Sequence, residues 1–344
     1  MQKGEKNIIV SFLKVFFAYE VALAHYNKSF VLFTGRWCVD YYFIISGYFL
    51  LNSFYSEKYK TSVEYTLHRV KRIYPYYLSA FLLLEAYSFF RTPSSFLTDP
   101  IGKIAQALPE LFLLQNIGWF DGGVNYPLWY LCCLFIASHI YFSLLQWNRK
   151  LVLQGICPII ALMFGAYYIN VYNNHVVSLW DVKAGVFYIP LWRSFCFLGI
   201  GLMLREVVSM IPHDKYESIN GFKKSDLALF FIFLILFIHE RNRVSSYLPF
   251  ISLLYLSSCI HIKQSKLLIN IAKVSEKLQL SIFLNHALII KVFNDASHRI
   301  KLSTNTITCL FIIALTFLSL SCYYVITYLL KKTKKNSIKR RTVS

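Results

Sequence analysis

The chain has 344 residues, of which 56% are hydrophobic, 18% aromatic and only 15% charged. Soluble domains carry about a quarter charged residues, and here the apolar residues form long blocks, so water is the wrong solvent for most of the chain. The net charge of +19 does not indicate nucleic-acid binding, because the excess Lys and Arg lie in short segments between these blocks. That distribution is typical of proteins oriented in an anionic membrane.

Ten apolar blocks follow one another along the chain. They fall at 8–25, 36–55, 73–90, 127–146, 151–170, 185–204, 225–239, 247–262, 278–293 and 304–330. Lipid offers no partners to backbone polar groups, and the blocks lack the alternation of barrel strands, so helices are expected. The sequence therefore predicts an all-α bundle of about ten transmembrane helices. A further apolar segment, 104–119, is interrupted by Pro109 and Gly118 and is expected to lie at the outer interface.

The distribution of Lys and Arg orients the bundle. With both termini in the cytoplasm, the inner segments hold 24 of these residues and the outer segments nine, which agrees with the positive-inside rule. We expect one membrane domain at 1–330 and a basic cytoplasmic tail at 331–344. The first block is expected to be a retained helix and not a signal peptide, because Lys14 and Glu20 interrupt it.

The eight cysteines lie almost entirely inside apolar blocks. They form no CxxC pair and no Cys/His spacing suited to zinc. We therefore expect small buried hydrophobic side chains and no metal site.

Two ionisable residues of the first block, Lys14 and His25, are eleven positions apart. On a helix they return to within about 20° of the same face, about 16 Å apart along the axis. They therefore line one stripe of the bundle without touching. Ionisable groups in lipid are costly, so both are functional candidates. The alternatives are a Lys14 side chain that reaches the inner headgroups and a His25 ring at the interface.

The second block carries Asp40 and, six residues later, Ser46-Gly47. A carboxylate within lipid needs a partner or water, and small residues permit close approach of another helix. Structure alone could explain both features.

The sequence HRVKRIYP at 68–75 precedes the third block. Arg69 and Arg72 are three positions apart and would share one face of a helix. Two guanidinium forks suit a multiply phosphorylated ligand better than one charge would. The alternative is a positively charged anchor beside the third helix.

Five motifs occur in a fixed order along the chain. They are Lys14 with His25, CVDYYFIISGY at 38–48, RVKRIYP at 69–75, PLW at 127–129 and LSIFLNH at 280–286. Their order and spacing resemble the acyltransferase-3 family, membrane-embedded acyltransferases that modify bacterial surface polysaccharides and related sugars. Two departures are clear. Lys14 replaces the family arginine and so lacks its bidentate fork, and YLCC follows PLW where many relatives carry a Ser-x-x-Glu.

The resemblance implies acetyl-CoA or a related acyl-CoA as a cytoplasmic co-substrate, with no bound cofactor. It implies that a hydroxyl of a cell-surface or lipid-linked saccharide accepts the acyl group, at the cytoplasmic membrane of a bacterium, with membrane lipids as the other partners. The implied site residues are His25 and Asp40 for catalysis, Lys14, Arg69 and Arg72 for donor binding, and Ser46, Trp129 and His286 for lining the substrate path.

The predicted topology independently places Arg69 and Arg72 on the cytoplasmic side. His25 is expected to act as a general base, since imidazole with its usual pKa suits neutral pH, or to carry the acyl group covalently. Asp40 is expected to orient or polarise a neighbouring group.

Two other functional classes fit a polytopic chain. A transporter or flippase for a polysaccharide or glycolipid would use the intramembrane charges to line a permeation path. Paired helix interruptions and midplane charges in corresponding halves of the chain would support this reading. The sequence shows no such paired interruptions, and its intramembrane charges cluster in the first third. An accessory membrane subunit without chemistry of its own is the third reading.

Overall fold

The computed structural model describes residues 8–115, 125–176, 183–184, 187–210, 224–240, 242–259, 265–297 and 302–341. The helices are α1 (Ile8–Tyr26), α2 (Gly35–Tyr55), α3 (Ser62–Arg91), α4 (Pro93–Thr98), α5 (Pro100–Leu111), α6 (Trp129–Leu151), α7 (Cys157–Tyr172), α8 (Ile189–Ser209), α9 (Lys224–Glu240), α10 (Tyr247–Cys259), α11 (Lys266–Ser297) and α12 (Thr304–Arg341). Short 3₁₀ turns lie at Lys28–Phe30, Tyr126–Leu128 and Val244–Ser246, and a π-helical turn at Val152–Ile156 joins α6 to α7. The two-residue strands β1 (Lys183–Ala184) and β2 (Phe187–Tyr188) pair antiparallel.

The all-α prediction is confirmed for the described residues apart from these two short strands, and each of the ten apolar blocks contains a helix. Within the described part of the chain, three helical segments are long and apolar enough to cross a membrane. They are Ile8–Tyr26, Tyr126–Tyr172 and Thr304–Thr333, and shorter apolar helices lie at Ala228–Glu240 and Val244–Ser258. The chain therefore has the character of a membrane protein. The count of ten spans and the cytoplasmic termini stay predictions.

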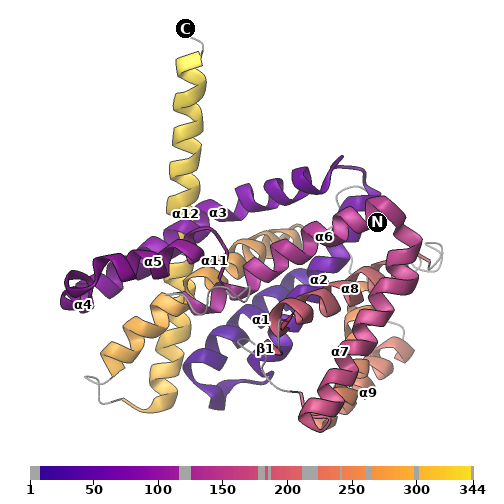
Figure 1. Cartoon of the computed structure of the whole chain (residues 1–344). Helices are drawn as coiled ribbons and strands as arrows, with labels where there is room; N and C mark the ends of the chain where they lie inside the picture. The colour runs from indigo at the N-terminus through magenta and orange to yellow at the C-terminus, as the bar shows by residue number, and fades with distance from the viewer. Residues whose placement is uncertain are drawn as a thin grey trace.

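Two predicted boundaries differ from the structure. The third apolar block begins at residue 73, but its helix, α3, begins at Ser62, where the Thr61 side chain accepts a hydrogen bond from the Glu64 N–H. The predicted tail continues as helix to Arg341, since a run rich in Lys and Arg keeps good helix propensity. α12 consequently projects beyond the other helices (Figure 1).

The predicted outer segment 104–119 corresponds in part to α5. Asp99 caps this helix by accepting from the Gly102 N–H, and Pro100 occupies its first turn. Apolar side chains of α5, among them Ile101 and Ile104, are exposed, as expected for a helix that lies at an interface. Residues 116–119 lie outside the described residues.

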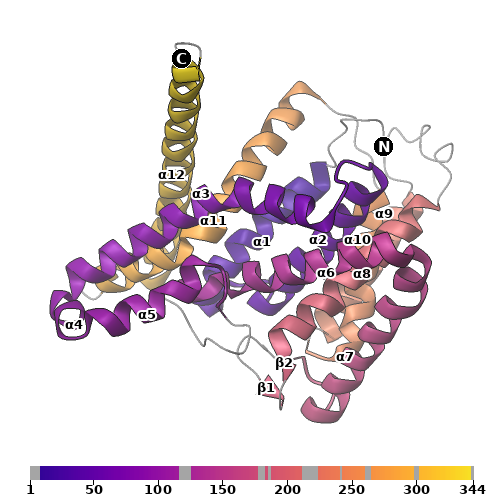
Figure 2. The ribbon, with the colours of Figure 1, turned by 45° about the horizontal axis from the view of Figure 1, so that its top comes forward.

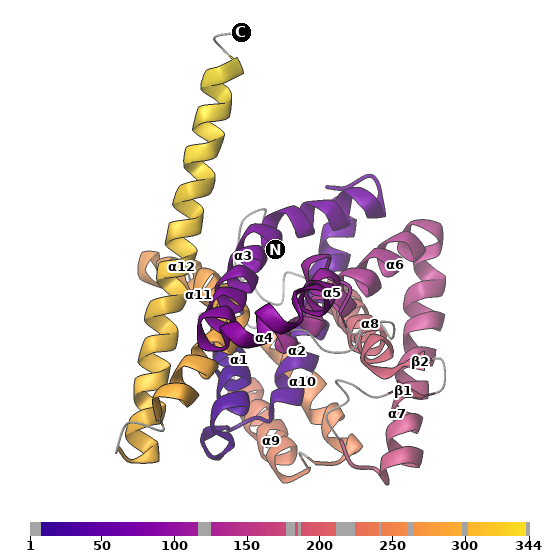
Figure 3. The same ribbon diagram turned by 60° about the vertical axis from the view of Figure 1, so that its left-hand side comes forward.

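α2 and α8 pack backbone against backbone. A Cβ atom added to Gly47 would meet the Leu198 carbonyl oxygen at 2.0 Å, and one added to Gly201 would meet the Ile44 oxygen at 1.9 Å. The prediction that Ser46-Gly47 permits close helix approach is thus confirmed. In Figures 2 and 3, α12 and α7 lie on opposite sides of the bundle, with α1 and α2 between them.

α1 packs along α11, and α11 packs along α12. Lys14 of α1 and Lys277 of α11 line one cavity, whereas His25 and His286, farther along the same two helices, stack on each other. The two helices therefore run in the same direction, and they connect the cavity to the histidines.

Candidate functional site

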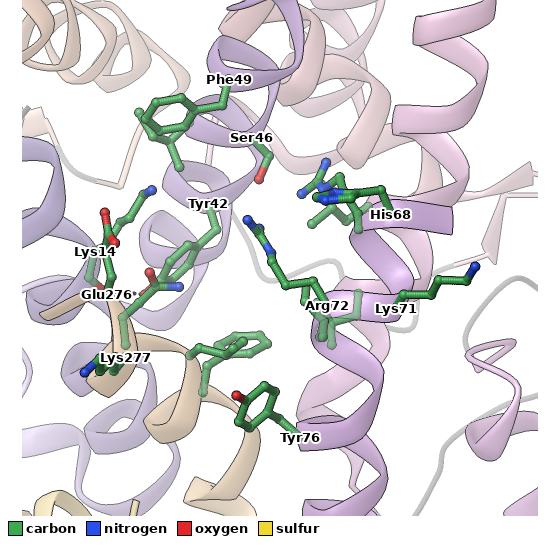
Figure 4. A pocket seen from close by; sticks show the side chains of 18 of the residues that line it. Lys14, Tyr42, Ser46, Phe49, His68, Lys71, Arg72, Tyr76, Glu276 and Lys277 are labelled. Atoms are coloured by element: carbon green, nitrogen blue, oxygen red, sulfur yellow. Dashed lines mark hydrogen bonds between the residues drawn. The ribbon is translucent and has the colours of Figure 1, made fainter. Parts of the chain in front are cut away.

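A cavity of about 880 Å³ opens between α1, α2, α3, α6, α11 and α12 (Figure 4). Its described lining includes seven basic residues, Lys14, Lys58, Arg69, Lys71, Arg72, Lys273 and Lys277. Glu276 is the single carboxylate among the described lining residues. Such an excess of positive charge raises the local concentration of anions and suits a polyanionic ligand.

The two α3 arginines that line the cavity, Arg69 and Arg72, differ in how firmly they are held. One guanidinium nitrogen of Arg69 donates to the Tyr65 hydroxyl at 2.9 Å and to Ser138 Oγ at 3.2 Å. Arg69 is thereby fixed against α6. Arg72 extends from α3 across the cavity toward α2, while Lys71 points to the other side of the helix (Figure 4). The structure thus places Arg69 and Arg72 together in the cavity wall, as their spacing predicts.

Lys14 and Ser46 line the same cavity. The Lys14 ammonium group lies 4.4 Å from the centroid of the Phe49 ring, within range of a cation–π interaction. The Tyr42 hydroxyl donates to the Lys14 carbonyl and joins α2 to α1. Ser46 hydrogen-bonds Tyr130 of α6. Four of the predicted site residues therefore share one space.

The α11 wall of the cavity carries basic residues that sequence reasoning did not single out. Lys273 and Lys277 are one helical turn apart and flank Glu276. The Lys277 ammonium group lies 5.3 Å from the Tyr324 ring and 5.9 Å from the Tyr323 ring. Their i, i+4 spacing just before the ninth block is the signal in the sequence, and the positive-inside pattern accounts for it equally well.

His68 adds a titratable group to the cavity. Its Nδ1 lies 2.9 Å from the Tyr59 hydroxyl. Burial, together with the positive charges of Lys58 and Arg72, lowers the pKa of His68 below its ordinary value. This shift favours the neutral imidazole, and a bound anion would favour its protonation.

His25 and His286 lie beyond the far end of this cavity and are not among its described lining residues. Their ring centroids are 5.6 Å apart and their planes differ by 23°. The Tyr126 ring meets His25 edge-on at 5.3 Å. His286 is fully buried, whereas His25 is exposed. The structure thus brings together two predicted site residues that are 261 positions apart.

Asp40 lies elsewhere, on the seam between α2 and α8. Its Oδ1 accepts from Arg193 Nε at 2.7 Å, and its Oδ2 accepts from the Tyr247 hydroxyl at 2.9 Å. All three side chains are buried, so Arg193 supplies the partner that a carboxylate in lipid needs. Asp40 is not among the described residues that line the basic cavity.

Trp129 does not line the cavity either among the described residues. Its ring is buried and lies 6.3 Å from that of Phe43. Within the described ranges, no group of three or more His, Cys, Asp or Glu side chains could hold a metal ion.

Comparison with known proteins identifies one family. The acyltransferase-3 family model, described as an acyltransferase domain, matches residues 8–328. The resemblance drawn from the motifs is thereby confirmed. No curated protein and no solved structure matches the chain.

Proposed function

Because the chain belongs to the acyltransferase-3 family over nearly its whole length, we propose that it transfers an acyl group from acyl-CoA to a saccharide hydroxyl. Acetyl is the acyl group expected, and the acceptor is a cell-surface or lipid-linked glycan. The setting is the cytoplasmic membrane of a bacterium, with both termini of the chain inside.

The observation that carries this proposal is the basic cavity. Coenzyme A bears a phosphate and a diphosphate at one end and its thioester at the end of a long flexible arm. Arg69 and Arg72 in the α3 wall, with Lys14, Lys273 and Lys277 in the wall that α1 and α11 form, offer charge-assisted hydrogen bonds to those phosphates. Lys14 keeps the charge of the family arginine, while Arg69 and Arg72 supply the bidentate forks.

The arrangement of α1 and α11 supports a route from the phosphates to His25. Lys14 and His25 are separated by about 16 Å along α1. Phe283 of α11 lines the cavity, and its ring centroid lies 6.0 Å from that of His286. A donor with its phosphates at the arginines would extend its arm along these two helices, past Phe283, to the histidines.

In the chemical step, the acceptor oxygen attacks the thioester carbonyl, and the C–S bond breaks as coenzyme A leaves. His25 removes the hydroxyl proton as a general base and passes it to the leaving sulfur. The alternative is a first transfer of the acyl group to the His25 ring and a second to the sugar. Both routes use the same imidazole, and trapping of an acyl-enzyme after rapid quenching distinguishes them.

Purified protein in nanodiscs, supplied with labelled acetyl-CoA and candidate glycans, tests the proposal. We expect label on the glycan with wild-type protein and none with His25→Ala, although that variant still binds CoA. Full transfer by a normally expressed His25→Ala variant would overturn the assignment of His25. Movement of intact glycan across the membrane without label would favour a transporter.

A further inference from the structure

The buried ring of His286 has a defined tautomer. Its Nδ1 lies 2.9 Å from the Phe283 carbonyl oxygen and 3.3 Å from that of Ile282. Carbonyl oxygens only accept hydrogen bonds, so Nδ1 carries the proton and Nε2 carries a lone pair. Nε2 has no hydrogen-bond partner in the structure as described. Because the His25 and His286 rings are stacked, this in-plane lone pair does not point into the His25 ring.

Asn125 presents a second acceptor of this kind. Its Nδ2 donates to the Leu284 carbonyl at 3.2 Å, which fixes the amide orientation and leaves Oδ1 at the other end. Its backbone N–H donates to Glu110 Oε1 at 2.9 Å. Asn125 is 1% exposed, and Oδ1 lacks a partner among the described residues.

Gln115 is a third residue with a buried, unpaired acceptor. Its Nε2 donates to the Tyr77 hydroxyl at 3.2 Å, and that hydroxyl donates in turn to the Glu110 carbonyl. Oε1 of Gln115 is therefore the free end of the amide, and it is buried with no partner in the described structure. Gln115 and Asn125 are joined through Glu110.

A chain of contacts links these three residues to His25. Asn125 bonds the carbonyl of Leu284, two positions before His286, and the next residue, Tyr126, contacts the His25 ring. His25 and Tyr126 are exposed, so this chain of contacts reaches the protein surface at these two residues.

Buried acceptors without donors are costly and uncommon in folded proteins. All three unpaired atoms are acceptors, which selects the chemistry of a matching ligand. A phosphate or carboxylate would add further acceptors, whereas a polyol supplies several O–H donors. The site thus complements neutral hydroxyl groups and disfavours anions.

We propose that His286 Nε2, Asn125 Oδ1 and Gln115 Oε1 form a hydroxyl-recognition site, which receives neighbouring O–H groups of a neutral sugar ring and holds the reacting hydroxyl at His25. This inference rests on the proposed acyl transfer to a saccharide. His286 is a positioning residue here, since its lone pair binds a hydroxyl that does not react. Specificity for the acceptor lies in this site, and affinity for the donor lies in the basic cavity.

Methyl glucosides and galactosides, with their 2-, 3-, 4- and 6-deoxy analogues, are the probes. Saturation-transfer NMR on the nanodisc-embedded protein reports binding without turnover, and transfer of labelled acetyl reports the KM for each glycoside. In wild-type protein, we expect removal of a recognised hydroxyl to raise the KM about tenfold. His286→Phe keeps a ring of similar volume and lacks Nε2. In this variant we expect the KM for the parent glycoside to rise by the same factor. The KM for one deoxy analogue should then equal the KM for its parent.

Asn125→Leu and Gln115→Leu are second and third variants, each expected to abolish discrimination at a different hydroxyl. CoA affinity should stay within twofold of wild type in all three, which separates this site from the donor cavity. Equal discrimination in wild type and all three variants, or no saturation transfer to any glycoside, would overturn the inference. If the glycosides bind in a variant-dependent way but no acetyl is ever transferred, the hydroxyl site stands and the proposed function fails.

Discussion

Phe283 lines the basic cavity and lies against His286, with 6.0 Å between the two ring centroids. One aromatic side chain therefore separates the cations of the cavity from the histidine pair. Tyr42 and Tyr130 lie beside it, at 5.8 and 5.3 Å between ring centroids. The thioester end of a donor held by its phosphates would have to pass this aromatic group to reach His25.

Replacing Phe283 by Ala should uncouple the two halves of the site. We expect the smaller side chain to admit water beside the histidines, so hydrolysis of acetyl-CoA without acceptor rises severalfold and transfer to glycan falls. The ratio of the two rates is the measurement. Phe197→Ala is the matched control, because Phe197 is equally buried but packs on Tyr247, away from the cavity. An equal change of the ratio in both variants would show a general loss of packing.

Arg72→Ala should weaken CoA binding by roughly tenfold to a hundredfold, because a charge-assisted hydrogen bond contributes about 1.5–3 kcal/mol. Arg72→Lys keeps the positive charge without the bidentate fork, so its affinity for CoA should lie between those of wild type and Arg72→Ala. Isothermal titration with CoA measures both. Lys60→Ala removes an equal charge near the cavity, and Lys60 is not among the described lining residues. If Lys60→Ala loses as much affinity for CoA as Arg72→Ala, the loss reflects the overall positive charge and not a specific contact of Arg72.

CoA binding should be linked to proton uptake by His68. The pKa of the free imidazole lies below its ordinary value because of burial and of Lys58 and Arg72, and phosphates placed among these cations would raise it. Affinity in wild-type protein should therefore increase, relative to His68→Gln, as the pH falls from about 7 to 6. Calorimetry in buffers of different ionisation enthalpy measures the proton uptake directly. Equal uptake in wild type and His68→Gln would exclude this histidine as its source.

The buried pair of Asp40 and Arg193 should be structural. Breaking it with Asp40→Asn or Arg193→Met alone leaves a buried group without its partner and should cost about 3–5 kcal/mol of stability. The double variant Asp40→Leu with Arg193→Met should recover part of that loss. Its thermal midpoint and transfer rate decide whether Asp40 also has a catalytic role. Recovery of folding without recovery of transfer would support the expectation from sequence that Asp40 acts in catalysis.

Deleting residues 331–344 should slow donor association. The deleted segment carries seven Lys and Arg and no acidic residue, and Leu330, just before it, lines the basic cavity. Positive charge at the mouth of a site raises the association rate of anions and loses its effect as salt rises. Stopped-flow binding of CoA should show a lower association rate at low salt and little difference at high salt. If the deletion changes the dissociation rate of CoA and not its association rate, residues 331–344 contact the bound donor directly.

Those features of the site that depend on helix periodicity could be predicted from the sequence. Lys14, Arg69, Arg72 and Ser46 share a cavity because each lies on a predictable helix face, and the family motifs give their order. The close approach at Gly47 follows from the absence of a side chain at this residue.

The features that could not be predicted from the sequence depend on which helices, distant along the chain, pack against each other. Nothing local in the sequence pairs Asp40 with Arg193, 153 positions away. Lys273 and Lys277 serve equally well as orienting charges until α11 is placed against α1 and α3. Apolar blocks do not indicate the start of α3 or the extension of α12, because a helix continues through polar residues wherever its backbone hydrogen bonds and caps allow.

The most direct test of the account is a structure of the His25→Ala variant with a non-hydrolysable acetyl-CoA analogue in a nanodisc. We predict that the phosphates lie against Arg69, Arg72, Lys273 and Lys277, and that the acetyl end passes Phe283 to reach the space vacated by the His25 ring. Phosphates bound outside this cavity, or an acetyl end that stays on the cavity side of Phe283, would contradict it.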